Sequence, residues 1–141
     1  PVEDLAMHLP LICDRYELRD DVSSGAGKFR GGLGVRISYR VLVPCKVTIN
    51  CERTVCPPWG VAGGGEGGSN IAVIKPASGP ERTVLKGTEI ALQAGDLVTF
   101  ETAGGGGYGR PDERPGAALE SDVRQGFVSA AEAKRRYQRA S

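Results

Sequence analysis

Three glycine-rich segments are the part of the sequence whose residue types could do chemistry, because glycine loops cradle phosphates in nucleotide-binding proteins. They occupy residues 23–34, 57–68 and 104–109 of a chain of 141 residues. A phosphate-binding loop has the pattern Gly-x-x-x-x-Gly-Lys-Ser/Thr, but here Phe29 follows Gly27 and Lys28, and Val22 stands where the leading glycine belongs. No segment connects a strand to a helix in a βαβ unit. We therefore expect no phosphate binding by this domain, and expect most of these glycines to serve tight turns and positive φ angles.

The third segment is different, because it has four consecutive glycines, residues 104–107, before Tyr108. This is more than a turn needs, and such a stretch lets the backbone approach another chain or a substrate closely. The alternative is a flexible linker. Since Tyr108 and the sequence Gly109-Arg110-Pro111 follow directly, we favour a packed functional or interface loop.

Titratable and nucleophilic side chains offer few sites. His8 is the only histidine and falls on an expected surface helix, so triads and histidine-based metal sites are not expected. We expect the four cysteines to be free thiols in a reducing cytoplasm, with Cys51 a small core residue. Asp96, Glu101 and Asp112 are possible acids or bases, although turn and surface roles are commoner for such carboxylates. No catalytic group is assigned from the residues alone, and no metal site is expected.

The elements that would position these segments are mainly strands. Residues 1–9 weakly predict a helix and residues 11–19 a strand. Alternating apolar residues over 35–43 and about 46–52 predict an antiparallel hairpin with a turn near Pro44. Shorter strands are expected at residues 70–75, 82–86, 90–93 and 97–102, the last two separated by a turn at residues 94–96. Helices are expected at 116–125, ended by Gly126, and from a capping box of Ser129 and Glu132 through Tyr137. The fold class is therefore mainly β: a small antiparallel β barrel or sandwich followed by two short helices.

Composition limits the partners. The 141 residues suffice for one domain, and 18 basic against 17 acidic residues create no field that would attract nucleic acid or a membrane surface. No apolar run reaches membrane-spanning length. The opening Pro1-Val2-Glu3-Asp4 has the character of a first helical turn without its capping residue, so we expect a single domain, residues 1–141, cut from a longer chain.

The order of the unusual segments is more specific than any one of them. Ser-Ser-Gly-Ala-Gly-Lys-Phe-Arg-Gly-Gly-Leu-Gly at 23–34 precedes Pro-Pro-Trp-Gly at 57–60, Gly-Asp-Leu-Val at 95–98 and Gly-Gly-Gly-Gly-Tyr-Gly at 104–109. Together with Arg-Tyr-Glu-Leu-Arg at 15–19 and Asp-Val-Arg-x-Gly-x-Val-Ser at 122–129, this order closely resembles the hydantoinase B/oxoprolinase family over essentially the whole chain. Arg110 departs from the family, which usually has an acidic residue there.

The resemblance implies the C-terminal part of a longer B subunit that works with an A subunit, or a fused A region, similar to acetate and sugar kinases. That partner would bind ATP and Mg²⁺ and phosphorylate an amide or lactam oxygen, so that water can attack the ring of a hydantoin or 5-oxoproline. The isolated chain would be inactive and would bind no cofactor itself. The alternatives are a non-catalytic β binding or assembly module, or a component of a related ATP-dependent ketone carboxylase. Substrate-binding or interface loops are expected at Arg30, Gly31, Gly32, Trp59, Gly60, Gly106, Gly107, Tyr108 and Gly109.

Overall fold

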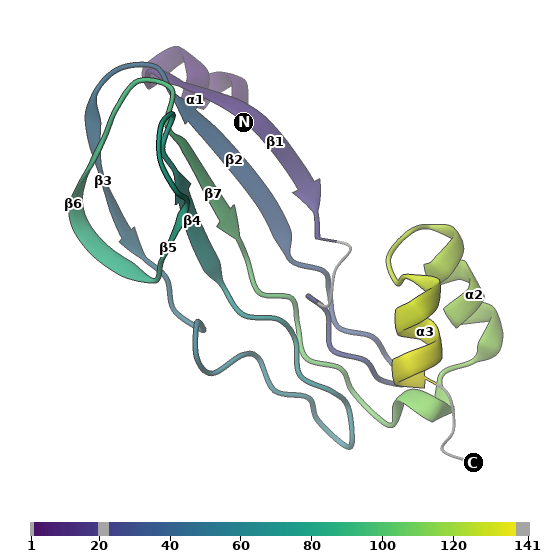
Figure 1. The fold of residues 1–141 in the computed structure, drawn as a ribbon. Helices are drawn as coiled ribbons and strands as arrows, with labels where there is room; N and C mark the ends of the chain where they lie inside the picture. The colour runs from purple at the N-terminus through teal and green to yellow at the C-terminus, as the bar shows by residue number, and fades with distance from the viewer. Residues whose placement is uncertain (1, 20–22, 138–141) are drawn as a thin grey trace.

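The computed structural model of the chain describes residues 2–19 and 23–137. Its elements follow one another along the chain as Figure 1 shows. They are α1 (Val2–His8), β1 (Leu11–Leu18), β2 (Val35–Val41), β3 (Cys45–Asn50), β4 (Ile71–Lys75), β5 (Arg82–Val84), β6 (Lys86–Leu92), β7 (Leu97–Glu101), the 3₁₀ turn η1 (Pro111–Glu113), α2 (Gly116–Arg124) and α3 (Ala130–Tyr137).

The strands form two antiparallel sheets that pack as an open sandwich. Five strands pair in the order β1-β2-β7-β4-β5, and β3 pairs with β6 in a second, two-stranded sheet. The mainly β class and the two C-terminal helices are confirmed, and of the two expected architectures the sandwich is present, since no barrel closes among the described strands. The buried core draws on both sheets. It consists of Val41, Ile49, Ala72, Ile74, Leu92 and Val98.

The expected hairpin of β2 and β3 is wrong. Both edges of β2 are occupied, by β1 and β7, and the chain crosses at residues 42–44 to the other sheet, where β3 pairs with β6. Alternation identifies the face that a strand buries but not its partner. Val41 of β2 and Ile49 of β3 thus meet in one core from opposite sheets.

Strand β6 is longer than the sequence indicated, because it begins at Lys86 instead of Ile90. Glu89 has a φ of 50° within it, and the register against β3 shifts between Val47 and Ile49. This irregularity interrupts the two-residue period, which hid the first half of the strand. The turn before β7 is confirmed, with Gly95 at a φ of 93°.

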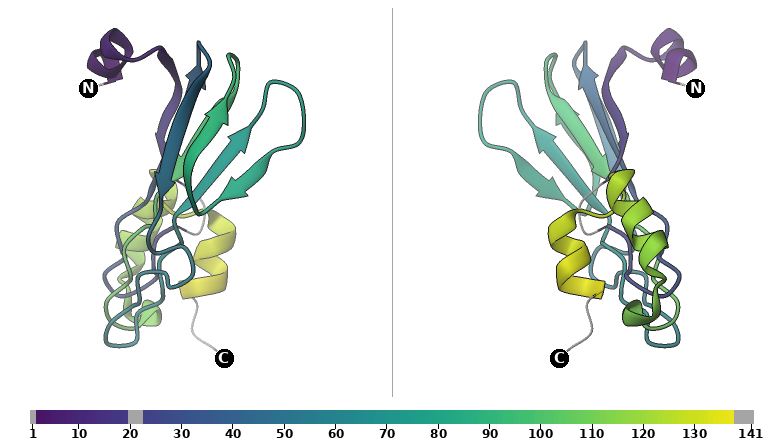
Figure 2. Two further views of the ribbon diagram at one scale, coloured as in Figure 1. Left: turned by 90° about the vertical axis from the view of Figure 1, so that its left-hand side faces the viewer. Right: turned by 90° about the vertical axis from the view of Figure 1, so that its right-hand side faces the viewer.

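The strand register brings the three glycine segments to one end of the sandwich. Leu18 at the end of β1 pairs with Val35 at the start of β2, and Glu101 at the end of β7 pairs with Ile71 at the start of β4. The loops therefore lie at the same end of the sandwich and extend beyond it (Figures 1 and 2). They are loop 1 (residues 23–34), loop 2 (residues 51–70) and loop 3 (residues 102–110). Helix α1 lies at the opposite end, while α2 and α3 pack beside the loops (Figure 1).

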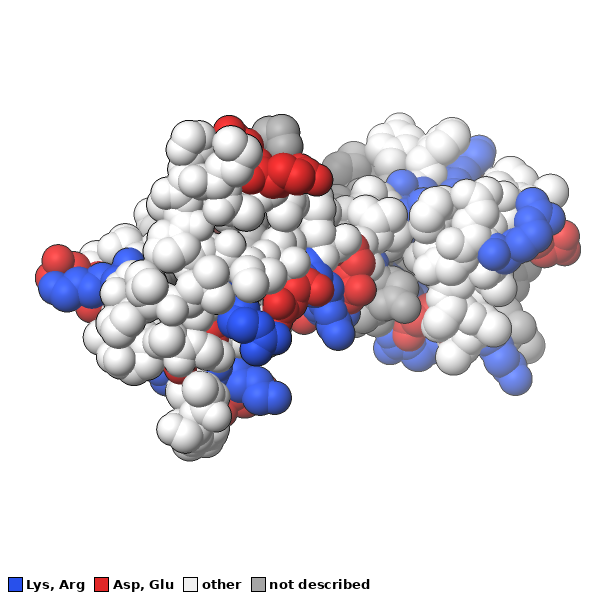
Figure 3. Space-filling model, turned by 90° about the horizontal axis from the view of Figure 1, so that it is seen from above, with Lys and Arg blue, Asp and Glu red and all other residues white. Residues whose placement is uncertain are grey.

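The helices differ in how they meet the sandwich. Helix α1 buries no residue, and the end of the molecule where it lies carries acidic and basic side chains side by side (Figure 3). The expected helix stop is confirmed, since Gly126 has a φ of 75°, and so is the cap of α3, where the Glu132 amide donates to Ser129 Oγ at 3.1 Å. None of the helices in residues 2–19 and 23–137 is long and apolar enough to cross a bilayer.

Candidate functional site

The three loops pack against one another backbone to backbone, and together they form what we call the glycine-loop bundle. Loop 1 donates to loop 3 through the Gly25 amide, which lies 2.8 Å from the Gly105 carbonyl oxygen. Loop 3 donates to loop 2 through the Gly107 amide, 2.9 Å from the Gly65 oxygen, and Gly65 in turn donates to Ala26 of loop 1 at 2.7 Å. Each loop is thus joined to the other two by peptide hydrogen bonds, which give buried peptide groups the partners they need.

Glycine is required in the bundle because the loops lie too close for side chains. A Cβ atom on Gly31 would lie less than 3.0 Å from the Gly105 oxygen, and one on Gly106 or Gly107 would overlap the backbone of loop 2 or loop 1. The expectation that most loop glycines serve turns and positive φ angles is therefore wrong. Positive φ among the described glycines occurs only at Gly63, Gly79, Gly95, Gly109 and Gly126.

The close approach predicted at residues 104–107 is present. The group that these glycines approach is the chain's own backbone, in loops 1 and 2, where the sequence suggested another chain or a substrate. Among the expected site residues, Gly31, Gly107 and Gly109 are buried, whereas Gly32 is exposed and a Cβ there would meet nothing within 4 Å.

Arg19 holds the bundle where it joins the sandwich. Its side chain is only 6% exposed, and Nη1 donates to the carbonyl oxygens of Ser69 at 3.1 Å and Thr102 at 3.0 Å, in loops 2 and 3. Glu101 pairs with the same guanidinium at 3.4 Å. Ser23 is fully buried nearby, donating through Oγ to the Arg19 oxygen and accepting from the Gly34 amide. The sequence placed Arg19 at the end of a strand and of the motif at residues 15–19, but nothing in its pattern indicated that this arginine is buried.

Arg30, expected in a binding or interface loop, faces the C-terminal helices. Its Nε donates to Asp122 Oδ2 of α2 at 3.3 Å, and its guanidinium lies 5.3 Å from the centre of the Phe127 ring. Arg114 donates to the same Asp122 oxygen at 2.7 Å. The sequence pointed to neither Asp122 nor Arg114 individually, although Asp122 opens the motif at residues 122–129.

The bundle carries large apolar side chains that remain in solvent. We call them the apolar edge: Phe29, Trp59, Val61 and Tyr108. Tyr108 is bridged to Phe29 on one side and to Val61 on the other, and the Phe29 and Tyr108 ring centres lie 6.2 Å apart. Each of the four is 51–65% exposed. Trp59 and Tyr108 are therefore not core residues, and their exposure is compatible with the substrate-binding or interface role expected for their loops.

The candidate carboxylates have structural partners. Asp96 is buried and accepts the amides of Ala77 and Gln93, each at 2.9 Å, which fixes the turn before β7. Glu101 pairs with Arg36 at 2.7 Å as well as with Arg19, and Asp112 pairs with Arg110 at 2.7 Å. These contacts agree with the turn and surface roles that the sequence favoured.

Two of the cysteines, Cys51 and Cys56, belong to loop 2, whereas His8 ends α1 at the opposite end of the sandwich. All four cysteines are free, and Cys51 and Cys45 are half-buried against the sandwich core. His8 is exposed, with Nε2 3.4 Å from Asp4. In the part of the chain that the structure describes, no three His, Cys, Asp or Glu side chains gather as metal ligands would.

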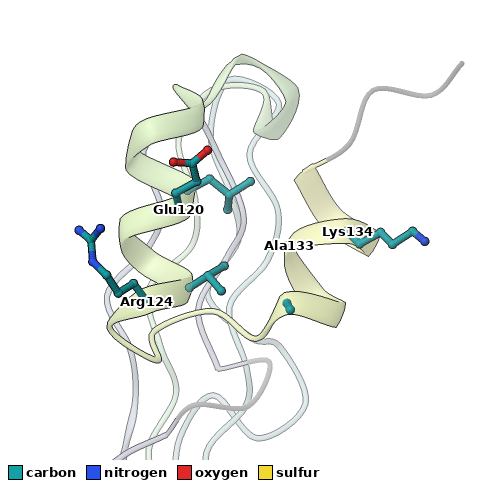
Figure 4. A pocket seen from close by; sticks show the side chains of 7 residues that line it. Glu120, Arg124, Ala133 and Lys134 are labelled. Carbon is teal, nitrogen blue, oxygen red and sulfur yellow. The ribbon is translucent and has the colours of Figure 1, made fainter.

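A groove of about 470 Å³ lies between α2 and α3. Its floor is apolar, with Leu119 and Val123 from α2 and Ala133 from α3. Figure 4 shows Arg124 and Lys134 directed away from the space between the helices, so these polar groups do not converge as in an active site.

Comparison with known proteins relates this architecture to one family. The model of the hydantoinase B/oxoprolinase family matches residues 1–111. An uncharacterized protein of Methanocaldococcus jannaschii is 39% identical over 139 residues, which make up 97% of this chain and 24% of that protein. The caprolactamase subunit beta of Pseudomonas jessenii is 35% identical over 133 residues, which make up 91% of this chain and 23% of that subunit.

Solved structures share the fold. The crystal structure of the ATP-dependent caprolactamase from Pseudomonas jessenii has a TM-score of 0.87 at 30% identity, over 97% of this chain and 24% of that chain. A nucleotide-free acetone carboxylase has a TM-score of 0.80 at 19% identity, over 97% of this chain and 22% of that one. The chain spans about a quarter of the length of these relatives. The family model covers most of the chain, and relatives such as the caprolactamase subunit beta match it over nearly its whole length, so the chain belongs to the hydantoinase B/oxoprolinase family.

Proposed function

We propose that this chain is the C-terminal, glycine-loop domain of the B component of an ATP-dependent cyclic-amide hydrolase, which opens a lactam or hydantoin ring. The observation that carries the proposal is the likeness to the ATP-dependent caprolactamase, at 30% identity over 97% of this chain. In the proposed reaction the γ-phosphoryl group of ATP passes to the amide oxygen, water attacks the activated carbon, and the ring C–N bond breaks with release of phosphate.

Within such an enzyme the chain would supply a rigid support. The bundle is fixed by peptide hydrogen bonds and by the buried Arg19, so it can hold the apolar edge in one position. We propose that Trp59 and Tyr108 contact the rest of the enzyme or the substrate. Gly31, Gly106 and Gly107 would act through packing, since their Cβ positions are occupied by backbone. Gly32, Gly60 and Gly109 complete the same loops.

The partner would be an ATP-binding A subunit or a fused A region. The relative of Pseudomonas jessenii is named as a beta subunit, which supports a multisubunit enzyme. We propose that ATP and Mg²⁺ bind to this partner and to none of the loops described here, because the loops lack the Gly-Lys-Ser/Thr pattern. A cytoplasmic location fits an ATP-dependent reaction and four free thiols.

The test is reconstitution. The full-length subunit containing this chain is purified with its ATP-binding partner, and ADP release is measured with caprolactam, 5-oxoproline and hydantoin, alongside the ring-opened product by mass spectrometry. Coupled ADP release and ring opening support the proposal. ADP release that requires acetone and bicarbonate would instead identify a ketone carboxylase, an alternative that the shared acetone carboxylase fold favours. A stable complex that consumes ATP with none of these substrates would refute cyclic-amide hydrolysis. The remaining hypothesis would then be a non-catalytic binding or assembly module.

A further inference from the structure

Arginine side chains in and next to the helical hairpin α2–α3 bind the glycine-loop bundle by hydrogen bonds. Arg114, next to η1, donates through Nη1 to the Lys28 oxygen of loop 1 at 3.0 Å and through Nη2 to Asp122 at 2.7 Å. Arg136 of α3 donates through Nη1 to the Ser24 oxygen at 3.0 Å and lies 3.5 Å from the Glu66 oxygen of loop 2. Two loops are thus held by their carbonyl oxygens, which the guanidinium group suits because it offers five donors in a fixed plane.

Asp122 is the centre of these contacts. One oxygen, Oδ2, accepts from Arg30 of loop 1 and from Arg114, so a single carboxylate joins the hairpin to the bundle. The three side chains are 10–16% exposed, which places the ion pairs largely out of solvent. Breaking such a pair from one side leaves an uncompensated buried charge and is costly. Two cations would lose their shared anion if Asp122 were neutralised.

The hairpin also seals loop 1 with apolar contacts. Ala26 of loop 1 packs with Val128 and Tyr137 in a small buried cluster, to which Leu119 and Ala133 contribute. Ala26 is the residue whose carbonyl oxygen accepts the Gly65 amide, so the cluster lies directly on a contact between loops 1 and 2. The family model ends at residue 111, so Arg114, Asp122 and Arg136 lie outside the matched segment.

We propose that Asp122 is a positioning residue, which holds the glycine-loop bundle, and with it the apolar edge, in the arrangement that the assembled enzyme uses. It touches no reacting atom. It acts through Arg30 and Arg114. Arg30 follows Phe29 of the apolar edge, and Arg114 follows the η1 turn that leaves loop 3. Its consequence for turnover rests on the proposed hydrolase function, whereas its effect on loop order does not.

The test compares Asp122→Asn with Glu120→Gln in the full-length subunit, by hydrogen–deuterium exchange read peptide by peptide. Glu120 lies on the same helix, is exposed and makes no ion pair with the described residues, so the control removes the same charge without the contact. Asp122→Asn should accelerate exchange of the bundle amides on the order of 100-fold, as expected for a broken buried pair, while β4 and β7 keep their protection. Unchanged loop exchange, or an equal increase in the sheet, would overturn the proposal.

Two further arms separate positioning from simple loss of folding. If Asp122→Asn does not fold, the single variants Arg30→Gln and Asp122→Glu replace it. Asp122→Glu keeps the charge and should therefore retain part of the amide protection that Arg30→Gln loses. In the reconstituted enzyme Asp122→Asn should lower kcat and leave the KM for ATP unchanged. A wild-type enzyme that opens no cyclic amide would end the hydrolase proposal, while the exchange experiment would still decide the role of Asp122.

Discussion

Replacing Gly31 with alanine adds one methyl group at a point where the glycine-loop bundle has no room. The Cβ atom would lie less than 3.0 Å from the Gly105 oxygen, so loops 1 and 3 must separate. Gly105 accepts from the Gly25 amide and donates to the Gly32 oxygen, and both bonds are strained by that movement. Gly32→Ala is the matched control, because a Cβ there meets nothing within 4 Å and Gly32 does not have a positive φ.

The two changes should differ by several kcal/mol. Overpacking costs about 1–3 kcal/mol and two weakened hydrogen bonds about 1 kcal/mol each. Both variants gain about 0.4–1 kcal/mol from the lower entropy of the unfolded chain. Gly31→Ala should therefore lower the free energy of unfolding by about 3 kcal/mol, whereas Gly32→Ala should leave it unchanged or raise it by up to about 1 kcal/mol. At roughly 2–4 °C per kcal/mol, Gly31→Ala should lose about 6–12 °C in Tm.

Urea unfolding followed by circular dichroism gives the free energies, and fluorescence of Trp59, the single tryptophan, reports on loop 2 separately. Gly31→Ala should lose the Trp59 signal at a lower urea concentration than Gly32→Ala. Equal stability of the two variants, within about 0.5 kcal/mol, would refute the conclusion that backbone contact is the reason for glycine in the bundle.

Three other changes test separate contacts. Arg19→Met removes donors to loops 2 and 3 and should cost about 2–3 kcal/mol in urea unfolding, against less than about 0.5 kcal/mol for the exposed Arg15→Met; equal costs would contradict the buried role of Arg19. Asp96→Ala removes the buried acceptor of two amide hydrogen bonds, from Ala77 and Gln93, and should cost about 2 kcal/mol by the same assay; a neutral result would show that water replaces the carboxylate. Burial raises the pKa of Tyr137 above its ordinary value of 10.0, despite the opposing charges of nearby arginines. The stability from its neutral form is therefore complete below pH 10 and lost as the pH rises through the folded-state pKa, so Tyr137→Phe should flatten the alkaline fall in Tm; an unchanged profile would count against this.

The local structure was largely predictable from the sequence. Strands with a clean two-residue period, such as β2, and the capped helix α3 were found within a few residues, because the signal lies in neighbouring side chains. Pairing was not predictable: β3 joins β6 across a separation that no local pattern records, and Glu89 breaks the period in the middle of β6. The choice between barrel and sandwich depends on that pairing.

The sequence predicted unusual glycine loops but not how those loops contact one another. The glycine segments identified the loops that converge, yet the sequence suggested turns at most of these positions, where the structure has direct backbone contact. Arg30 was named for a binding or interface loop, and its partner Asp122 lies 92 residues away, beyond the reach of spacing arguments. Whether Trp59 and Tyr108 bind a substrate or a subunit stays a prediction, since their exposure fits either role.

The glycine-loop bundle buries peptide groups and little hydrocarbon. Its heat-capacity change on unfolding should therefore differ from that of the sandwich. Exposure of apolar surface raises the heat capacity, and exposure of polar surface lowers it. Opening the bundle alone should therefore carry a heat-capacity change near zero or negative, whereas unfolding the core around Ile74 and Val98 carries the usual positive one. Cooling weakens hydrophobic packing but leaves peptide hydrogen bonds in place, so near freezing the loops should be the part of the molecule that keeps its order best relative to room temperature.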